Sequence, residues 1–158
     1  MSKAFTKDDG PEAAPVPRRR APLPAGTPNY VTARGLRALR EELARVGAAA
    51  PAGDVQAQAA AAWRAELEER VATAVVVAPP DDRGEARFGA TVRLRDAEGR
   101  ARTVRIVGVD EADAAHGLVA FTAPLARAVL GRRAGDVVAV RAPGGEEELE
   151  VVSVSWDE

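Results

Sequence analysis

The chain has 158 residues, a formal net charge of −2, no cysteine and a single histidine. The absence of cysteine excludes disulfides and thiolate metal sites, and one histidine argues against a zinc centre. A near-neutral charge balance argues against strong non-specific binding to nucleic acid. The sequence has no apolar run of about 18 residues and no signal-peptide segment, so we expect a cytoplasmic protein without a membrane span.

Residues 1–28 are rich in proline and poor in large apolar side chains. Such a segment buries too little surface to offset the entropy of ordering the chain, so we expect a disordered tail. The basic triplet Arg18-Arg19-Arg20 within it could contact a phosphate backbone or an acidic protein, but a solvated tail is the favoured interpretation.

Two helices are predicted within residues 29–78. Thr32 is a suitable N-cap for the first, and the second should begin at Asp54 or the residue after it. Pro51-Ala52-Gly53 separates them, so we expect an antiparallel helical hairpin, a short coiled coil with its larger side chains at the base and its tip in solvent. Apolar residues at helical spacing form one face of each: Leu36, Leu39, Leu43 and Val46, then Ala59, Trp63, Leu67, Val71 and Ala74.

The rest of the chain is rich in strand and turn signals. Residues 79–87 are interpreted as a linker and residues 88–158 as one β domain. Ala90 to Asp96 alternates apolar and charged side chains and should pair with Arg102 to Val109 as a strand hairpin. A helical hairpin followed by antiparallel strands gives the α+β class. Further strands are expected at Leu118–Phe121, Val137–Val140 and Glu148–Trp156, with one short helix that Pro124 opens and Gly131 ends.

Several short stretches stand out as a set: Ala123-Pro124-Leu125-Ala126-Arg127-Ala128 with Gly131, Gly135-Asp136-Val137, Pro143-Gly144-Gly145-Glu146, Met1-Ser2-Lys3-Ala4-Phe5-Thr6-Lys7, and Leu23-Pro24-Ala25-Gly26 followed by Asn29-Tyr30-Val31-Thr32. They closely resemble the bacterial Gre transcript-cleavage factors, with the GreB branch closer than GreA. The resemblance implies an FKBP-like fold for residues 88–158. It also implies RNA polymerase as the partner, with nucleic acid contacted only through the polymerase.

In the Gre family the helical hairpin enters the secondary channel of RNA polymerase, where acidic tip residues help hold the second Mg²⁺ used to hydrolyse a backtracked transcript. Carboxylate oxygens suit this cation, and one metal of such a pair can activate water. This chain keeps Gly53 and Asp54 of the tip pattern but has Ala57 where the family has glutamate. The resemblance makes Asp54 the candidate catalytic residue, while an ordinary helix N-cap is the alternative that we favour.

The GreB family contacts the rim of the channel through an Asp-Ser-Pro segment. The matching positions here are Thr122, Ala123 and Pro124, so these are the candidate partner-binding residues. Pro124 equally suits a simple helix start, and both interpretations stay open.

Against the family's spacing each arm of the hairpin lacks about a dozen residues, which shortens its reach by about 18 Å at 1.5 Å per residue. We therefore expect a monomer that binds polymerase at the secondary channel, modulates elongation and is deficient in transcript cleavage. It should not be an enzyme. The FKBP-like fold does not imply peptidyl-prolyl isomerase activity, since such a pocket needs aromatic walls and the chain has few aromatic residues. No cofactor of its own is expected, and any Mg²⁺ would be shared with the polymerase active centre. The alternatives are an active cleavage factor that uses Asp54 and an interaction module that no longer binds polymerase.

Overall fold

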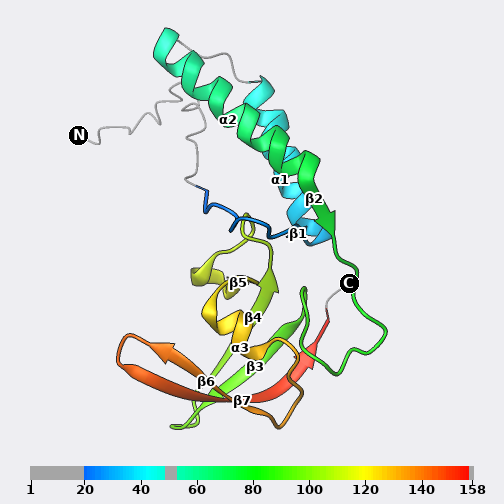
Figure 1. The fold of residues 1–158 in the computed structure, drawn as a ribbon, viewed down its shortest axis with the longest axis vertical. Helices are drawn as coiled ribbons and strands as arrows, with labels where there is room; N and C mark the ends of the chain where they lie inside the picture. The colour runs from blue at the N-terminus through cyan, green and yellow to red at the C-terminus, as the bar shows by residue number, and fades with distance from the viewer. Residues whose placement is uncertain (1–19, 49–52, 157–158) are drawn as a thin grey trace, which may run out of the picture.

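A computed structural model describes residues 20–48 and 53–156. A helical hairpin stands on one end of a five-stranded sheet, and a two-stranded sheet lies at the base of the hairpin (Figure 1). This arrangement confirms the predicted α+β class, with a helical hairpin followed by a β domain that carries one short α-helix. The predictions for residues 1–19 and for the turn at 49–52 lie outside the described residues.

The hairpin consists of α1 (Ala33–Ala48) and α2 (Asp54–Thr73). Thr32 caps α1 as predicted, because its Oγ1 accepts a hydrogen bond from the backbone N–H of Gly35 at 2.9 Å. The predicted apolar face is buried or partly buried except at Ala59, which is exposed because a single methyl group offers little apolar surface to bury. The buried core of the hairpin is Val31, Leu39, Val46, Trp63 and Leu67.

Two three-residue strands close the base of the hairpin. β1 (Asn29–Val31) and β2 (Ala74–Val76) pair in parallel. The sequence did not predict this pair, since three residues are too few to show a strand period. The Asn29 side chain donates a hydrogen bond to the carbonyl oxygen of Arg70 at 2.9 Å. The chain that enters α1 is thereby tied to the last turn of α2.

Five strands form the β domain: β3 (Thr91–Asp96), β4 (Ala101–Val107), β5 (Leu118–Ala120), β6 (Val137–Ala142) and β7 (Gly145–Ser155). Their order in the sheet is β5-β4-β3-β7-β6. The expected all-antiparallel sheet is wrong in one place, because β5 pairs in parallel with β4. Residues 108–117, which include the short 3₁₀ helix η1 (Ala114–His116), return the chain along the edge of β4 before β5 begins.

The core of the β domain lies between the sheet and α3 (Pro124–Val129). Pro124 is the first residue of this helix, as predicted, and Ala126 and Val129 are buried. The alternation predicted for β3 is also confirmed: Val92 and Leu94 are fully buried, whereas the arginine after each of them is exposed.

The segment expected to be a linker, residues 79–87, ends inside the β domain. Ala86 is fully buried. Its N–H donates to the Arg132 carbonyl oxygen at 2.8 Å, and its own carbonyl oxygen accepts from the Gly131 N–H at 2.7 Å. Because the backbone of Ala86 is bonded on both sides, the connection between hairpin and β domain ends before this residue.

Candidate functional site

Asp54, the candidate residue at the tip, is the first residue of α2 and is exposed. Gly53 precedes it as the N-cap with a φ of 92°, a conformation that favours glycine, and no side chain caps the helix. The N-cap role considered for Asp54 is therefore wrong. Its carboxylate lies in the first turn, where the helix dipole favours a negative charge.

The hairpin tip offers little to a divalent cation. Ala57 follows Asp54 by one turn and has no side-chain oxygen. Within residues 20–48 and 53–156, no group of three or more His, Cys, Asp or Glu side chains is placed to hold a metal ion. Mg²⁺ binds proteins through one or two carboxylates together with other oxygen donors, and Asp54 supplies one carboxylate at this end of α2.

The candidate docking loop joins β5 to α3. Thr122 and Ala123 are half-buried, whereas Pro124 is exposed. Ala123 is the N-cap residue of α3 and provides no side-chain acceptor, while Pro124 occupies the first helical position. Pro124 therefore starts a helix and also presents its ring to solvent, so the geometry is compatible with both interpretations given above.

An aromatic cluster ties this loop to the hairpin. The ring of Phe121, the residue before Thr122, lies 5.5 Å from the ring of Tyr30 in β1 and 5.6 Å from that of Phe88, both at steep interplanar angles. Tyr30 and Phe88 are 6.0 Å apart. Edge-to-face pairs of this kind stabilise a contact beyond the area that they bury. The candidate docking loop and the hairpin base are thus held by the same three rings.

A buried ionic network joins the N-terminal segment, the hairpin and the β domain. The Arg20 guanidinium lies 2.6 Å from a carboxylate oxygen of Glu42 and 2.9 Å from one of Asp110, which follows β4. Arg70 lies 3.7 Å from the second oxygen of Asp110. Trp63 Nε1 donates a hydrogen bond to Glu42 at 3.1 Å. The side chains of Arg20 and Asp110 are each only 5% exposed.

Arg20 lies within the range 1–28 that was expected to be a disordered tail, and for this residue the expectation is wrong. Burial alone would lower the pKa of Arg20, but hydrogen bonds and charge from Glu42 and Asp110 raise that pKa above its ordinary value. Two carboxylates therefore compensate the desolvation of one guanidinium. The proline content of the segment, on which the expected disorder rested, carries no information about this network.

The N-terminus of α1 is also fixed to the loop after β4. Thr32 Oγ1 donates a hydrogen bond to Glu111 Oε2 at 2.5 Å. Gly35 permits this approach, because a Cβ there would lie 2.8 Å from the Glu111 carboxylate. Gly108 is equally constrained, since a Cβ at this position would collide with the carbonyl oxygen of Tyr30.

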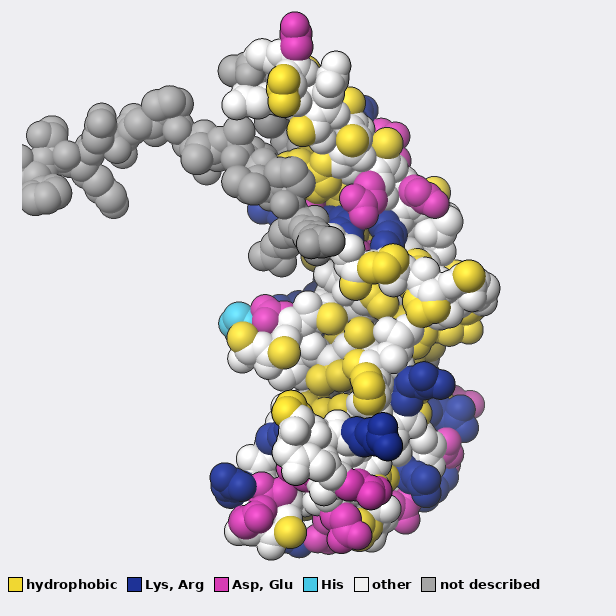
Figure 2. Space-filling view, turned by 60° about the vertical axis from the view of Figure 1, so that its left-hand side comes forward, with side chains coloured by type: hydrophobic (Ala, Val, Ile, Leu, Met, Phe, Trp, Pro, Cys, Tyr) yellow, Lys and Arg dark blue, Asp and Glu magenta, His cyan; other side chains and the backbone are white. Residues whose placement is uncertain are grey.

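Hydrophobic side chains gather at the waist between hairpin and β domain, while acidic and basic side chains mix over the far part of the β domain (Figure 2). This junction was not predicted from the sequence, because its aromatic residues Tyr30, Phe88 and Phe121 come from three distant segments. The junction fixes the hairpin to the β domain, with the candidate docking loop beside the hairpin base.

Comparisons with known proteins point to one family. A family model described as "Transcription elongation factor, GreA/GreB, C-term" matches residues 80–156. "Transcription elongation factor GreA" of Alkalilimnicola ehrlichii is 38% identical over 152 residues, covering 80% of this chain and 96% of that protein. "Transcription elongation factor GreA" of Anaeromyxobacter sp. is 48% identical over 96 residues, covering 60% of this chain and 58% of that protein.

Among solved structures, Gfh1 of Thermus aquaticus matches with a TM-score of 0.43 and 26% identity, covering 79% of this chain and 96% of that chain. Both relatives above carry the name GreA, whereas the sequence analysis placed the resemblance nearer to GreB. In the part of the chain that the structure describes, no helix has the length and apolar character needed to cross a membrane.

Proposed function

The chain belongs to the GreA/GreB family of transcription elongation factors, and from this membership we propose that it binds RNA polymerase at the rim of the secondary channel. There it modulates elongation by occupying the channel and does not stimulate transcript cleavage. It contacts nucleic acid only indirectly, through the polymerase.

The observation that carries the proposal is a short hairpin with one acidic residue at its tip. α1 has 16 residues and α2 has 20, so the longer arm extends about 30 Å at 1.5 Å per residue. The Alkalilimnicola ehrlichii relative has additional residues within the matched span, because 152 aligned positions take up only 80% of this 158-residue chain. A shorter arm would enter the channel but would not reach the active centre, which supports the proposal.

The chemistry of the tip supports the absence of cleavage activity. Asp54 is the only acidic residue between Gly53 and Trp63. A carboxylate that does not reach the active centre cannot add a ligand to a metal ion that activates water there. The tip of α2 instead carries exposed alanines, whose methyl groups cannot bind a metal ion.

The docking half of the proposal is supported by the loop of Thr122, Ala123 and Pro124. This loop is anchored on both sides, through the Phe121 N–H, which donates to the Val107 carbonyl oxygen at 2.9 Å, and through α3. An exposed proline on an anchored loop is a pre-organised contact, and pre-organisation lowers the entropic cost of association.

Cleavage is tested with purified, backtracked elongation complexes and this protein alone, with a cleavage-competent Gre factor as positive control. The transcripts should keep their length. Asp54→Asn should behave like the unaltered protein. Shortening that Asp54→Asn abolishes would contradict the proposal and identify an active cleavage factor.

Docking is tested by the affinity for purified RNA polymerase. Thr122→Asp restores the acid of the family's segment and should tighten binding, whereas Ala97→Asp adds the same charge in the exposed turn between β3 and β4 and should not. If the unaltered protein and Thr122→Asp both fail to bind, the docking proposal is wrong and an interaction module with another partner is favoured.

A further inference from the structure

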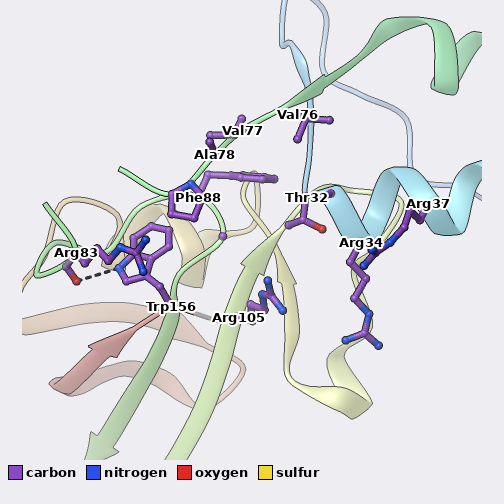
Figure 3. A pocket seen from close by; sticks show the side chains of 13 residues that line it. Thr32, Arg34, Arg37, Val76, Val77, Ala78, Arg83, Phe88, Arg105 and Trp156 are labelled. Carbon is purple, nitrogen blue, oxygen red and sulfur yellow. Dashed lines mark hydrogen bonds between the residues drawn. The ribbon is translucent and has the colours of Figure 1, made fainter. Parts of the chain in front are cut away.

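A cavity of about 590 Å³ lies between the hairpin base and the β domain. It is formed by the start of α1, the residues that follow β2, the approach to β3, one residue of β4 and the end of the chain after β7 (Figure 3). Its volume falls in the range of about 300–1,000 Å³ that is usual for small-molecule sites.

The lining of this cavity is strongly basic. Arg34, Arg37, Arg83 and Arg105 all contribute to it, and no aspartate or glutamate does. Several other arginines of the chain lie beside carboxylates, as Arg95 does with Glu150 at 2.8 Å. Among the described residues, none of the four lining arginines has an ion-pair partner within 4.0 Å. In a chain of net charge −2, this is a local concentration of uncompensated positive charge.

Arg105 supplies the clearest sign of a missing partner. Its Nε is buried and has no hydrogen-bond partner in the described structure. In the view of Figure 3, Arg105 lies between Trp156 on one side and Thr32 and Arg34 on the other. A buried guanidinium N–H without an acceptor is costly, and an anion in the cavity would remove that cost.

Two aromatic rings complete the site. Trp156 Nε1 donates a hydrogen bond to the carbonyl oxygen of Arg83 at 2.9 Å, which fixes the indole at the cavity wall. Gly89 lies beside the indole, since a Cβ there would be in ordinary van der Waals contact with the ring at 3.6 Å. Phe88 lines the cavity as well and is held by the aromatic cluster. Fixed ring faces beside guanidinium groups suit a flat heterocycle that carries phosphates.

We propose that this cavity binds a nucleoside triphosphate, with the phosphates on the arginines of α1 and β4 and the base against Trp156 and Phe88. The site is separate from the tip and from the docking loop, so the inference does not depend on the proposed function. A ligand there would touch both the hairpin and the β domain.

The test is calorimetric titration of the full chain, without polymerase, with ATP, GTP, inorganic triphosphate and inorganic phosphate. ATP or GTP should bind, and triphosphate should bind about ten-fold more weakly, because it lacks the base that stacks on the rings. Trp156→Leu should remove most of this difference between nucleotide and triphosphate.

Matched arginine variants locate the site. Arg34, Arg37 and Arg40 are all exposed on α1, but only the first two line the cavity. Arg34→Ala with Arg37→Ala should weaken nucleotide binding about ten-fold or more, and Arg40→Ala should leave it unchanged. Since all three side chains are exposed, folding should be retained.

Four results would overturn the proposal. One is the absence of nucleotide binding at millimolar concentration, and a second is equal loss of binding in the Arg40→Ala control. A third is equal affinity for inorganic phosphate and nucleotide, which would mean an adventitious anion only. A fourth is tighter binding of a polyglutamate peptide than of any nucleotide, which would assign the cavity to an acidic protein segment.

Discussion

Ala123 occupies a position where most helices have a side-chain acceptor. It is the N-cap of α3 and makes no capping hydrogen bond. Serine, threonine, asparagine and aspartate are preferred there because their oxygens accept from the free N–H groups of the first turn. Ala123 therefore leaves the free N–H groups of the first turn of α3 without a side-chain acceptor.

Ala123→Ser should therefore raise the free energy of unfolding by about 1 kcal/mol through capping of α3. Urea denaturation of the purified chain measures it. Ala97→Ser, in the exposed turn between β3 and β4, is the matched control and should change stability by less than about 0.5 kcal/mol. Equal effects of the two substitutions would show that the missing cap of α3 does not limit the stability of the chain.

The turn between β3 and β4 is built on one aspartate. The backbone N–H of Arg100 holds the pKa of Asp96 below its ordinary value, with the charge of Arg100 and the N–H of Glu98 adding to the effect. Asp96 accepts from these two N–H groups at 2.9 and 3.0 Å. Because the folded pKa is lowered, this carboxylate stabilises the fold above its unfolded pKa of about 3.9.

That stabilisation should be lost as the pH falls through the lower, folded pKa. The difference in stability between the unaltered chain and Asp96→Asn should thus shrink as the pH is lowered from about 6 to below about 4. Denaturant midpoints measured across this interval check it. A difference that stays constant over the whole interval would contradict the assigned role of Asp96.

Arg20 connects three elements that are distant in sequence. Its partners are Glu42 in α1 and Asp110 after β4, and its side chain is 5% exposed. Removal of one member of a buried ionic group leaves the others uncompensated.

Arg20→Met should therefore lower the free energy of unfolding by about 3 kcal/mol. Arg64→Met is the control, because Arg64 and Glu68 form an exposed pair within α2, and its cost should stay below about 0.5 kcal/mol. Chemical denaturation of both variants gives the comparison. Similar small losses in both would mean that the Arg20 network adds nothing to the junction.

Helices and strands were predicted correctly from the sequence where the spacing of apolar residues repeats over enough positions to show a helical or strand period. The spacing of Leu39, Val46, Trp63 and Leu67 gave both helices, and the alternation around Val92 gave β3. Prediction failed where an element depends on distant residues. β1 and β2 have three residues each, and the parallel direction of β5 is set by the path of the preceding loop.

At the scale of the whole molecule, the junction between hairpin and β domain escaped prediction for the same reason. Tyr30 meets Phe121, and Arg20 meets Asp110, across about 90 residues of chain in each case. The candidate docking residues, by contrast, were found through a local motif around Pro124. The roles of the tip and of the candidate docking loop stay predictions.

The molecule as a whole combines a short hairpin with an anchored candidate docking loop, and this combination supports the proposal that it occupies the secondary channel without cleaving. The most direct measurement titrates this protein into backtracked elongation complexes that contain a cleavage-competent Gre factor, and follows transcript shortening. The account predicts that shortening slows as the dose rises, because both proteins compete for one channel. Shortening that is unaffected at a large excess of this protein would contradict it.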